Sequence, residues 1–315
     1  AAGDRRDLAV AEDAGAIAAA AVDRAGSPPR LVAIVLRHRG LIAYNRGLLD
    51  EAKSLLTSAR EKFVALSGKD SLDVATAESA LGSVARAAGD LDASEAWHRS
   101  AYRIDRSLRP AQHPDLARDL HNIAGVLRLR GSLDEAARHY RSALAIEEAT
   151  SGATSVAAGL TRNSLGLVAM ARADWGEARS ELIRARDILA AAGHGDRAFA
   201  HHNLGIVEAN AGDHRLALEH YARAAEAYKD TIGSTTAPAT RLDLDRRRAE
   251  VAIGIDKRQP VKRSVAVEVS VEPPIRGTTA TQPTAAEIGT TPRPPDAPKP
   301  QPEPDVGVYG STQAW

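Results

Sequence analysis

Small residues recur along most of the chain at fixed distances, and both large apolar and polar residues lie between them. One copy of the pattern has small residues separated by six, four and six others, namely Gly40, Gly47, Ala52 and Ala59. The first residues of the later copies follow at intervals of 42, 42, 42 and 39 residues, at Gly82, Ala124, Gly166 and Gly205. Five copies with one period indicate an array of stacked structural units.

Each copy predicts two amphipathic helices joined by a tight turn. The second small residue, usually glycine, ends the first helix, and polar residues then begin the second, as in the run from Arg130 to Ala136. Large apolar residues share one position of the second helix in four copies, Leu56, Tyr140, Leu182 and Tyr221. A single hairpin cannot bury its apolar face alone, so neighbouring hairpins must stack to build a core.

The pattern resembles the tetratricopeptide repeat over roughly residues 30 to 230. The 42-residue spacing and the stretches 113–124 and 140–146 resemble the long-linker variety found in kinesin light chains and many bacterial regulators. The aromatic residue that this family usually carries in its first helix is mostly absent, with Leu120 and Asn163 near that point. The resemblance implies an all-α solenoid of helical hairpins in a right-handed superhelix.

The period divides the chain into four parts. Residues 1–29 are predicted to hold the second helix of a repeat whose first helix precedes Ala1. Residues 30–238 are predicted to form five repeats, and residues 239–253 a more polar capping helix, which a solenoid end requires. Residues 254–315 form a tail rich in proline and threonine.

The tail is predicted to be disordered with polyproline character. Eleven of the 16 prolines lie after residue 259, and the segment has no leucine or phenylalanine. Such a composition buries too little apolar surface to offset the entropy of ordering. Two functional roles for parts of this tail also stay open. The alternating residues 265–271 could add a strand to a partner's sheet, and the final ten residues, with Tyr309 and Trp315, could be a docking peptide.

Composition excludes several function classes. Lysine plus arginine equals aspartate plus glutamate at 41 each, which gives no broad basic field for nucleic acid or anionic lipid. The chain has no cysteine, so disulfides, thiolate metal sites and cysteine nucleophiles are excluded. No apolar run approaches the roughly 20 residues that span a bilayer, and no signal peptide is visible. We predict a cytoplasmic location.

No motif for catalysis or metal binding stands out. Five histidines cluster in sequence, at His194, His201, His202, His214 and His220. None has the spacing of a helical metal-protease motif, and adjacent histidines on a helix point about 100° apart. The chain also lacks a G-x-S-x-G elbow and a phosphate-binding glycine loop. We therefore expect no enzyme activity, no metal and no cofactor in these residues, with a catalytic domain upstream left open.

A peptide-binding groove along the concave side of the first helices is the sharper functional prediction. A carboxamide both donates and accepts hydrogen bonds and can hold an extended backbone, while arginine can pair with a carboxylate. The family resemblance implies peptide-holding asparagines just before the small residue, which carries over to Asn122 and Asn203; His38, Ala80 and Ser164 depart from it. We expect these asparagines to be wetted in the free protein. The predicted binding residues are Asn45, Arg86, His121, Asn122, Arg128, Asn163, His202, Asn203 and Asn210.

Three functional hypotheses follow from the sequence. The first is a protein-interaction scaffold that binds a protein or peptide segment in its groove. The second is the C-terminal regulatory region of a larger enzyme, because the repeats and the tail resemble the regions that follow the kinase domains of large bacterial Ser/Thr kinases. A hydrolase hidden within the repeats is the third and has no motif in its favour. The plain alternative for the groove residues is that they are ordinary solvated side chains.

Overall fold

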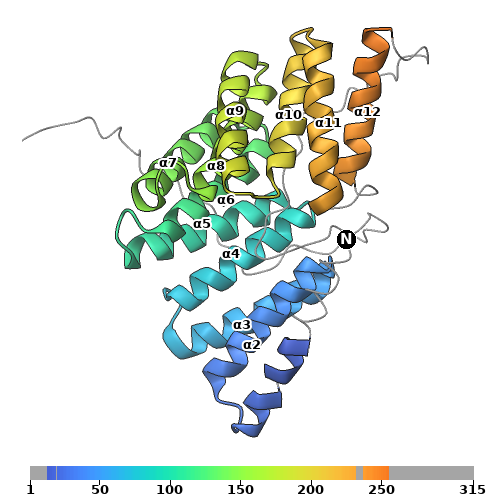
Figure 1. The fold of residues 1–315 in the computed structure, drawn as a ribbon. Coiled ribbons are helices and arrows are strands. Elements are labelled where there is room, and N and C mark those ends of the chain that lie inside the picture. Colours follow the sequence, from blue (N-terminus) through green and yellow to red (C-terminus); the bar gives the residue numbers. More distant parts are fainter. Residues whose placement is uncertain (1–12, 19, 232–236, 255–315) are drawn as a thin grey trace, which may run out of the picture.

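The computed structural model describes residues 13–18, 20–231 and 237–254, and every regular element in these ranges is an α-helix (Figure 1). Five hairpins follow one another: α2 (Pro29–Asn45) with α3 (Leu49–Ser67), α4 (Leu72–Ala87) with α5 (Leu91–Leu108), α6 (Pro114–Leu129) with α7 (Leu133–Ser151), α8 (Val156–Ala171) with α9 (Trp175–Ala191), and α10 (Arg197–Asn210) with α11 (His214–Thr231). The helix α12 (Ala237–Ala252) ends the array. The predicted all-α solenoid is confirmed.

The ends of the chain add little to this array. Residues 13–18 and 20–24 are helical and precede α2. The predicted tail, apart from Gly254, lies outside the described residues, as do its strand-like segment and its final aromatic residues. None of the helices in the described ranges is long and apolar enough to cross a bilayer.

A left-handed backbone residue makes the turn inside each hairpin. Glycine fills this place in four hairpins, at Gly47, Gly89, Gly131 and Gly212, with φ between 74° and 89°. The fourth hairpin has Ala173 there, with φ 59°, a conformation that a Cβ atom disfavours. Aspartate then caps three of the second helices, because Asp90 accepts from the backbone N–H of Ala93, Asp174 from that of Glu177 and Asp213 from that of Leu216.

Close approach of the two helices explains the first small residue of each copy. A Cβ atom on Gly40 would lie 2.7 Å from Leu56 Cγ, and one on Gly166 would lie 2.6 Å from Leu182 Cγ. The large residue of the second helix therefore lies directly against the glycine backbone of the first. In the second hairpin the same position holds His98, whose ring lies against Gly82.

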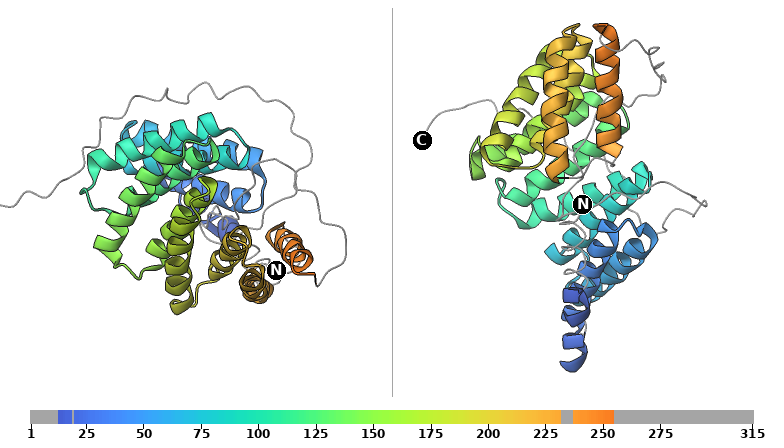
Figure 2. Two further views of the ribbon diagram at one scale, coloured as in Figure 1. Left: turned by 90° about the horizontal axis from the view of Figure 1, so that it is seen from above. Right: turned by 45° about the vertical axis from the view of Figure 1, so that its right-hand side comes forward.

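Stacking places the first helices on the inside of a curve. Each second helix packs on the first helix of the next hairpin, and each first helix also approaches the next one, from α2 with α4 to α10 with α12. Among the described helices, no such approach joins the second helices of neighbouring hairpins. Shorter distances lie on the inner side of a bend, so α2, α4, α6, α8 and α10 form the inner side of the curved array (Figure 2).

The core is built from contacts between neighbouring hairpins. Buried alanines let the helices approach, and the large aromatic side chains of Phe63, Tyr140 and Tyr221 fill the remaining space. One apolar cluster joins α2, α3, α4 and α5, and another joins α8, α9 and α10. Each cluster reaches only adjacent hairpins, as expected for a solenoid whose stability is a sum of local and nearest-neighbour terms.

Candidate functional site

All nine predicted binding residues lie on first helices. Asn45 is on α2, Arg86 on α4, and Asn163 on α8. The others are on α6 (His121, Asn122 and Arg128) and on α10 (His202, Asn203 and Asn210). They occupy equivalent places in the repeat, two or three residues before the first small residue or four or five after it. We call the twenty residues at these four places in the five repeats the inner face.

Two of the predicted asparagines bond to each other. Asn203 Nδ2 donates to Asn163 Oδ1 over 3.4 Å, joining α10 to α8. Asn163 is 1% exposed, Asn203 is 0% exposed and Asn122 is 8% exposed. The expectation that these asparagines are wetted is wrong, because the first helices approach closely and bury the residues that just precede the small position.

The two predicted histidines are also engaged within the array. His121 Nδ1 lies 2.9 Å from Thr161 Oγ1, and Thr161 donates to Glu147 Oε1 over 3.1 Å. Burial raises the pKa of Glu147, which the Thr161 hydrogen bond opposes. These contacts join the third and fourth hairpins, so part of the predicted site is structural.

His202 is fully buried beneath the last helix. Its Nε2 lies 3.1 Å from Asp245 Oδ2 of α12, and its Nδ1 lies 3.4 Å from Tyr228 Oη. Burial lowers the pKa of His202 despite the opposing Asp245 carboxylate. A neutral imidazole that donates from Nε2 to Asp245 fits these contacts. His202 therefore anchors α12 and offers no side chain to a ligand, contrary to its predicted role.

The remaining predicted residues differ in exposure. Arg86 and Arg128 are partly exposed, and each lies in the last turn of its helix. Asn45 is buried at the end of α2. Asn210 is exposed and donates a hydrogen bond to the carbonyl of Ile206 at 2.7 Å. The two arginines are thus the predicted residues best placed to meet a partner.

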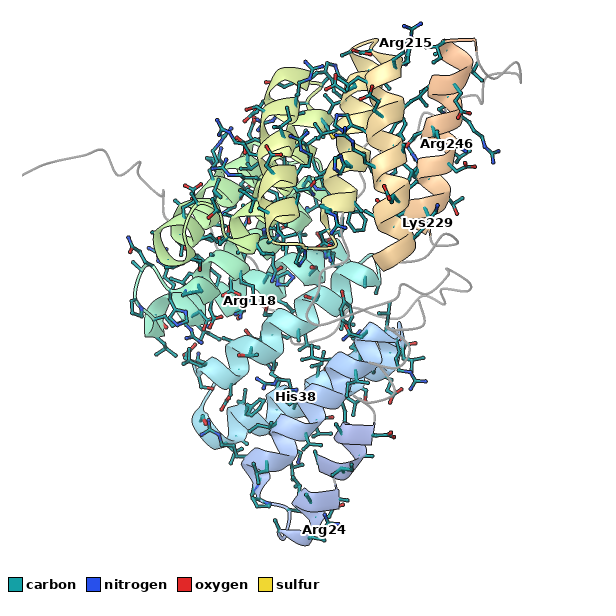
Figure 3. All side chains as sticks on the ribbon, viewed as in Figure 1. Arg24, His38, Arg118, Arg215, Lys229 and Arg246 are labelled. Atoms are coloured by element: carbon teal, nitrogen blue, oxygen red, sulfur yellow. The ribbon has the colours of Figure 1, made fainter. Side chains whose placement is uncertain are left out.

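The inner face has one sign of charge. None of its twenty residues is aspartate or glutamate, although the whole chain has as many acidic as basic residues. Its arginines are Arg37, Arg86 and Arg128, all within the first three repeats. His38, labelled in Figure 3, is exposed on α2. Its Nε2 lies 3.4 Å from Nη2 of Arg37 and adds a neutral donor or acceptor there. A positive face of this kind attracts anionic groups.

Sequence reasoning missed a buried carboxyl pair between the second and third hairpins. Asp105 on α5 and Asp119 on α6 are 2% and 0% exposed. Nη2 of Arg118, the residue labelled in Figure 3, lies 3.5 Å from Asp105 Oδ2 and 3.4 Å from Asp119 Oδ1. Burial, reinforced by Asp105, raises the pKa of Asp119 to about 8. Aligning the repeats could have indicated burial, because the residue four positions after the second helix's inner alanine is apolar or aromatic in three repeats, at Phe63, Leu189 and Tyr228, and acidic in one other, at Glu147.

Two histidines of the fifth hairpin contact each other, which the sequence analysis did not predict. His201 Nδ1 lies 3.2 Å from His220 Nδ1, so one ring must donate and the other accept. Burial, followed by the nearby His220 and three arginines, lowers the pKa of His201 to about 4. Within the described residues no three histidine, aspartate or glutamate side chains gather in a way that could hold a metal ion.

Comparison with known families identifies the repeats. A family model described as the tetratricopeptide repeat matches residues 31–107, 73–149 and 155–230. These matches cover more than half of the chain, which therefore belongs to the tetratricopeptide repeat family. A search of curated proteins found no match.

Solved structures of similar fold agree with the kinesin-light-chain-like spacing. BtubC (BKLC) from P. vanneervenii is 20% identical with a TM-score of 0.59, over 73% of this chain and 92% of that one. Nearly identical TPR-like repeats of a Podosopora anserina kinesin light chain are 17% identical with a TM-score of 0.54, over 64% and 97%. A Rap protein complexed with Competence and Sporulation Factor is 17% identical with a TM-score of 0.57, over 70% and 66%. At these identities the likeness shows the fold alone.

Proposed function

We propose that the chain is a protein-interaction scaffold whose inner face binds an extended peptide segment of a partner. One observation supports this most directly. The inner face runs along five successive first helices and combines arginines and carboxamides with a complete absence of carboxylates. Membership of the tetratricopeptide repeat family supports the same proposal, as does the Rap protein that was solved in complex with Competence and Sporulation Factor.

The burial of three predicted residues changes their roles in this proposal. Asn163, Asn203 and His202 are buried in contacts between helices. The Asn203–Asn163 hydrogen bond joins α10 to α8, and His202 joins α10 to α12 through Asp245. Arg86 and Arg128 lie at the C-terminal ends of their helices, and both residues are partly exposed. These arginines would bind carboxylate or backbone carbonyl groups of the partner, with Asn122 between them in sequence.

Selection from a random peptide library tests the proposal. Sixteen-residue peptides displayed on phage would be panned on the full chain, and enriched peptides would be synthesised and titrated by calorimetry. We expect Arg128→Ala and Asn122→Ala to weaken binding by about 1–3 kcal/mol, the cost of leaving a bonded polar group unpaired. The Arg128→Ala effect should shrink at high salt, because an exposed charge contact is screened.

The matched control is Arg184→Ala on the outer helix α9, whose side chain is 59% exposed. Equal losses in the inner-face and outer variants, or a selection that enriches no binding peptide, would refute the proposed function. The alternative of a regulatory region within a larger kinase stays a prediction of the sequence, and the cytoplasmic location stays with it.

A further inference from the structure

We infer that the chain carries its own ligand for the inner face, namely residues 300–315 of its C-terminal tail. The inference rests on the proposed function, since it assigns an occupant to the same face. It begins with the distribution of charge along the 61 residues that follow Gly254. Residues 255–299 carry both signs, with seven lysines or arginines among them. Residues 300–315 contain Glu303 and Asp305 and no lysine or arginine.

Charge complementarity therefore selects this one part of the tail. The inner face of the second and third repeats presents Arg86 and Arg128 at equivalent places, one repeat apart. None of the inner-face positions carries a carboxylate that would repel Glu303 or Asp305. Arginine binds carboxylates through a planar, two-pronged donor set, so a short acidic segment is the chemistry that this face fits.

The backbone preference of the same segment suits an extended binding mode. Pro300, Pro302 and Pro304 alternate with the polar and acidic residues. Proline fixes φ near the polyproline value, which reduces the entropy lost when a peptide is held extended. Val306, Val308 and Tyr309 follow at once and supply apolar surface beside the acidic residues. The sequence of the segment thus joins an anionic anchor to an apolar one, with prolines that favour an extended backbone.

The number of residues between the array and this segment sets its reach. Residues 255–299 number 45, and a chain of that length with random-coil statistics would have a root-mean-square span of about 35–40 Å. Tethering of this kind gives an effective ligand concentration on the order of millimolar, so even a weak peptide would occupy the face much of the time. A partner peptide would then have to displace residues 300–315, which would make the tail an intramolecular competitor.

Absence of cysteine makes the test direct. A nitroxide attached to Ser311→Cys would be the only spin label on the chain, and its spectrum reports whether residues near 311 tumble freely. We expect a broadened spectrum in the full chain, a sharp one after Arg86→Glu with Arg128→Glu, and a sharp one in about 1 M salt. Outer-face variants Arg141→Glu with Arg184→Glu should leave the broadened spectrum unchanged.

Charge exchange separates a specific contact from a loss of folding. Adding Glu303→Lys and Asp305→Lys to the Arg86→Glu and Arg128→Glu chain should restore the broadened spectrum. A sharp spectrum in the chain that carries only the label at Ser311→Cys would overturn the inference. A spectrum that stays broad in every variant would overturn it as well. A library peptide that binds the inner face equally well with and without Glu303→Lys and Asp305→Lys would also overturn it, while leaving the proposed function intact.

Discussion

Replacing His98 by leucine should stabilise the protein, although histidine is the native residue. His98 is 1% exposed, and neither of its ring nitrogens has a hydrogen-bond partner within the described residues. Leucine fills the equivalent position at Leu56 and Leu182, where it lies against a glycine as His98 does against Gly82. The substitution therefore removes a buried unpaired polar group from a position of suitable shape.

Two contributions determine how much His98→Leu should change the free energy of unfolding. An unpaired buried polar group costs about 1–3 kcal/mol, so His98→Leu should raise the free energy of unfolding by that amount near pH 7.5. For an array of this size the gain corresponds to a rise in Tm of about 2–10 °C. A second contribution appears in acid, because burial, with smaller effects of Arg86 and Arg118, lowers the pKa of His98 to about 3.

The sign of the acid effect is fixed by proton binding. A histidine in the unfolded chain has a pKa of about 6.5, so between pH 6.5 and pH 3 the unfolded state binds the extra proton. Native stability therefore falls as the pH drops through this window, by about 2 kcal/mol from His98 alone at pH 5. His98→Leu removes this dependence, and its advantage over the native chain should grow to about 3–5 kcal/mol at pH 5.

Urea unfolding followed by circular dichroism at pH 7.5 and pH 5 measures both contributions. Other buried histidines also make the chain acid-sensitive, so the quantity to compare is the difference between the variant and the native chain. Leu182→His is the matched control, because it creates the same arrangement over Gly166 and should lose stability, more so in acid. A His98→Leu chain that is less stable at pH 7.5, or that keeps the native pH dependence, would refute the reasoning.

Three further features can be tested by substitution with the same unfolding measurement. Ala173→Gly should add about 0.5–1 kcal/mol because it relieves a left-handed alanine, and Gly131→Ala should lose a similar amount; no difference in either would contradict the backbone argument. Asn203→Ala should cost about 1–3 kcal/mol by leaving Asn163 without its partner, whereas exposed Asn210→Ala should change stability by less than about 0.5 kcal/mol; equal effects would speak against a structural Asn163–Asn203 contact. Because the folded pKa of Asp119 is raised to about 8, the folded state holds the extra proton between roughly pH 4 and 8, and stability is lost as the pH rises. Asp119→Asn should therefore stabilise the chain more at pH 8.5 than at pH 4, and the opposite trend would show that the carboxylate is well satisfied when charged.

The repeating small residues were enough to predict the helices, their pairing and their stacking. Gly40 and Gly166 carry this information directly, because a Cβ atom at either position would collide with the leucine of the partner helix. Side-chain exposure was less predictable. Asn203 was expected at a wetted surface because polar residues usually remain solvated, yet its burial depends on how closely α8 and α10 approach. That distance is set by the packing of the whole layer and is not encoded in any local pattern.

The buried partners of polar residues were equally hard to predict. Asp105 and Asp119 are fourteen positions apart and belong to different helices, so each looks like a solvated residue in its own helix. Comparing Asp105 with Phe63 and Leu189 in the equivalent position would have indicated burial. The identity of the partner would still have required the three-dimensional stack, since it depends on the crossing of α5 and α6.

The carboxyl pair also bears on how the array comes apart. In a linear stack each joint between hairpins contributes its own coupling free energy, and cooperative unfolding divides where that coupling is weakest. The equivalent joint between the first and second hairpins is apolar, with Phe63 and Ala77 in one cluster. Between α5 and α6 it holds two acids, with Arg118 near both of them and Arg109 paired with Asp105. Above the pKa of Asp119 this joint must hold a second buried carboxylate, whose desolvation Arg118 offsets only in part. The second and third hairpins should then separate as independent cooperative units, which makes alkaline conditions the place to observe half of the solenoid folded and half of it open.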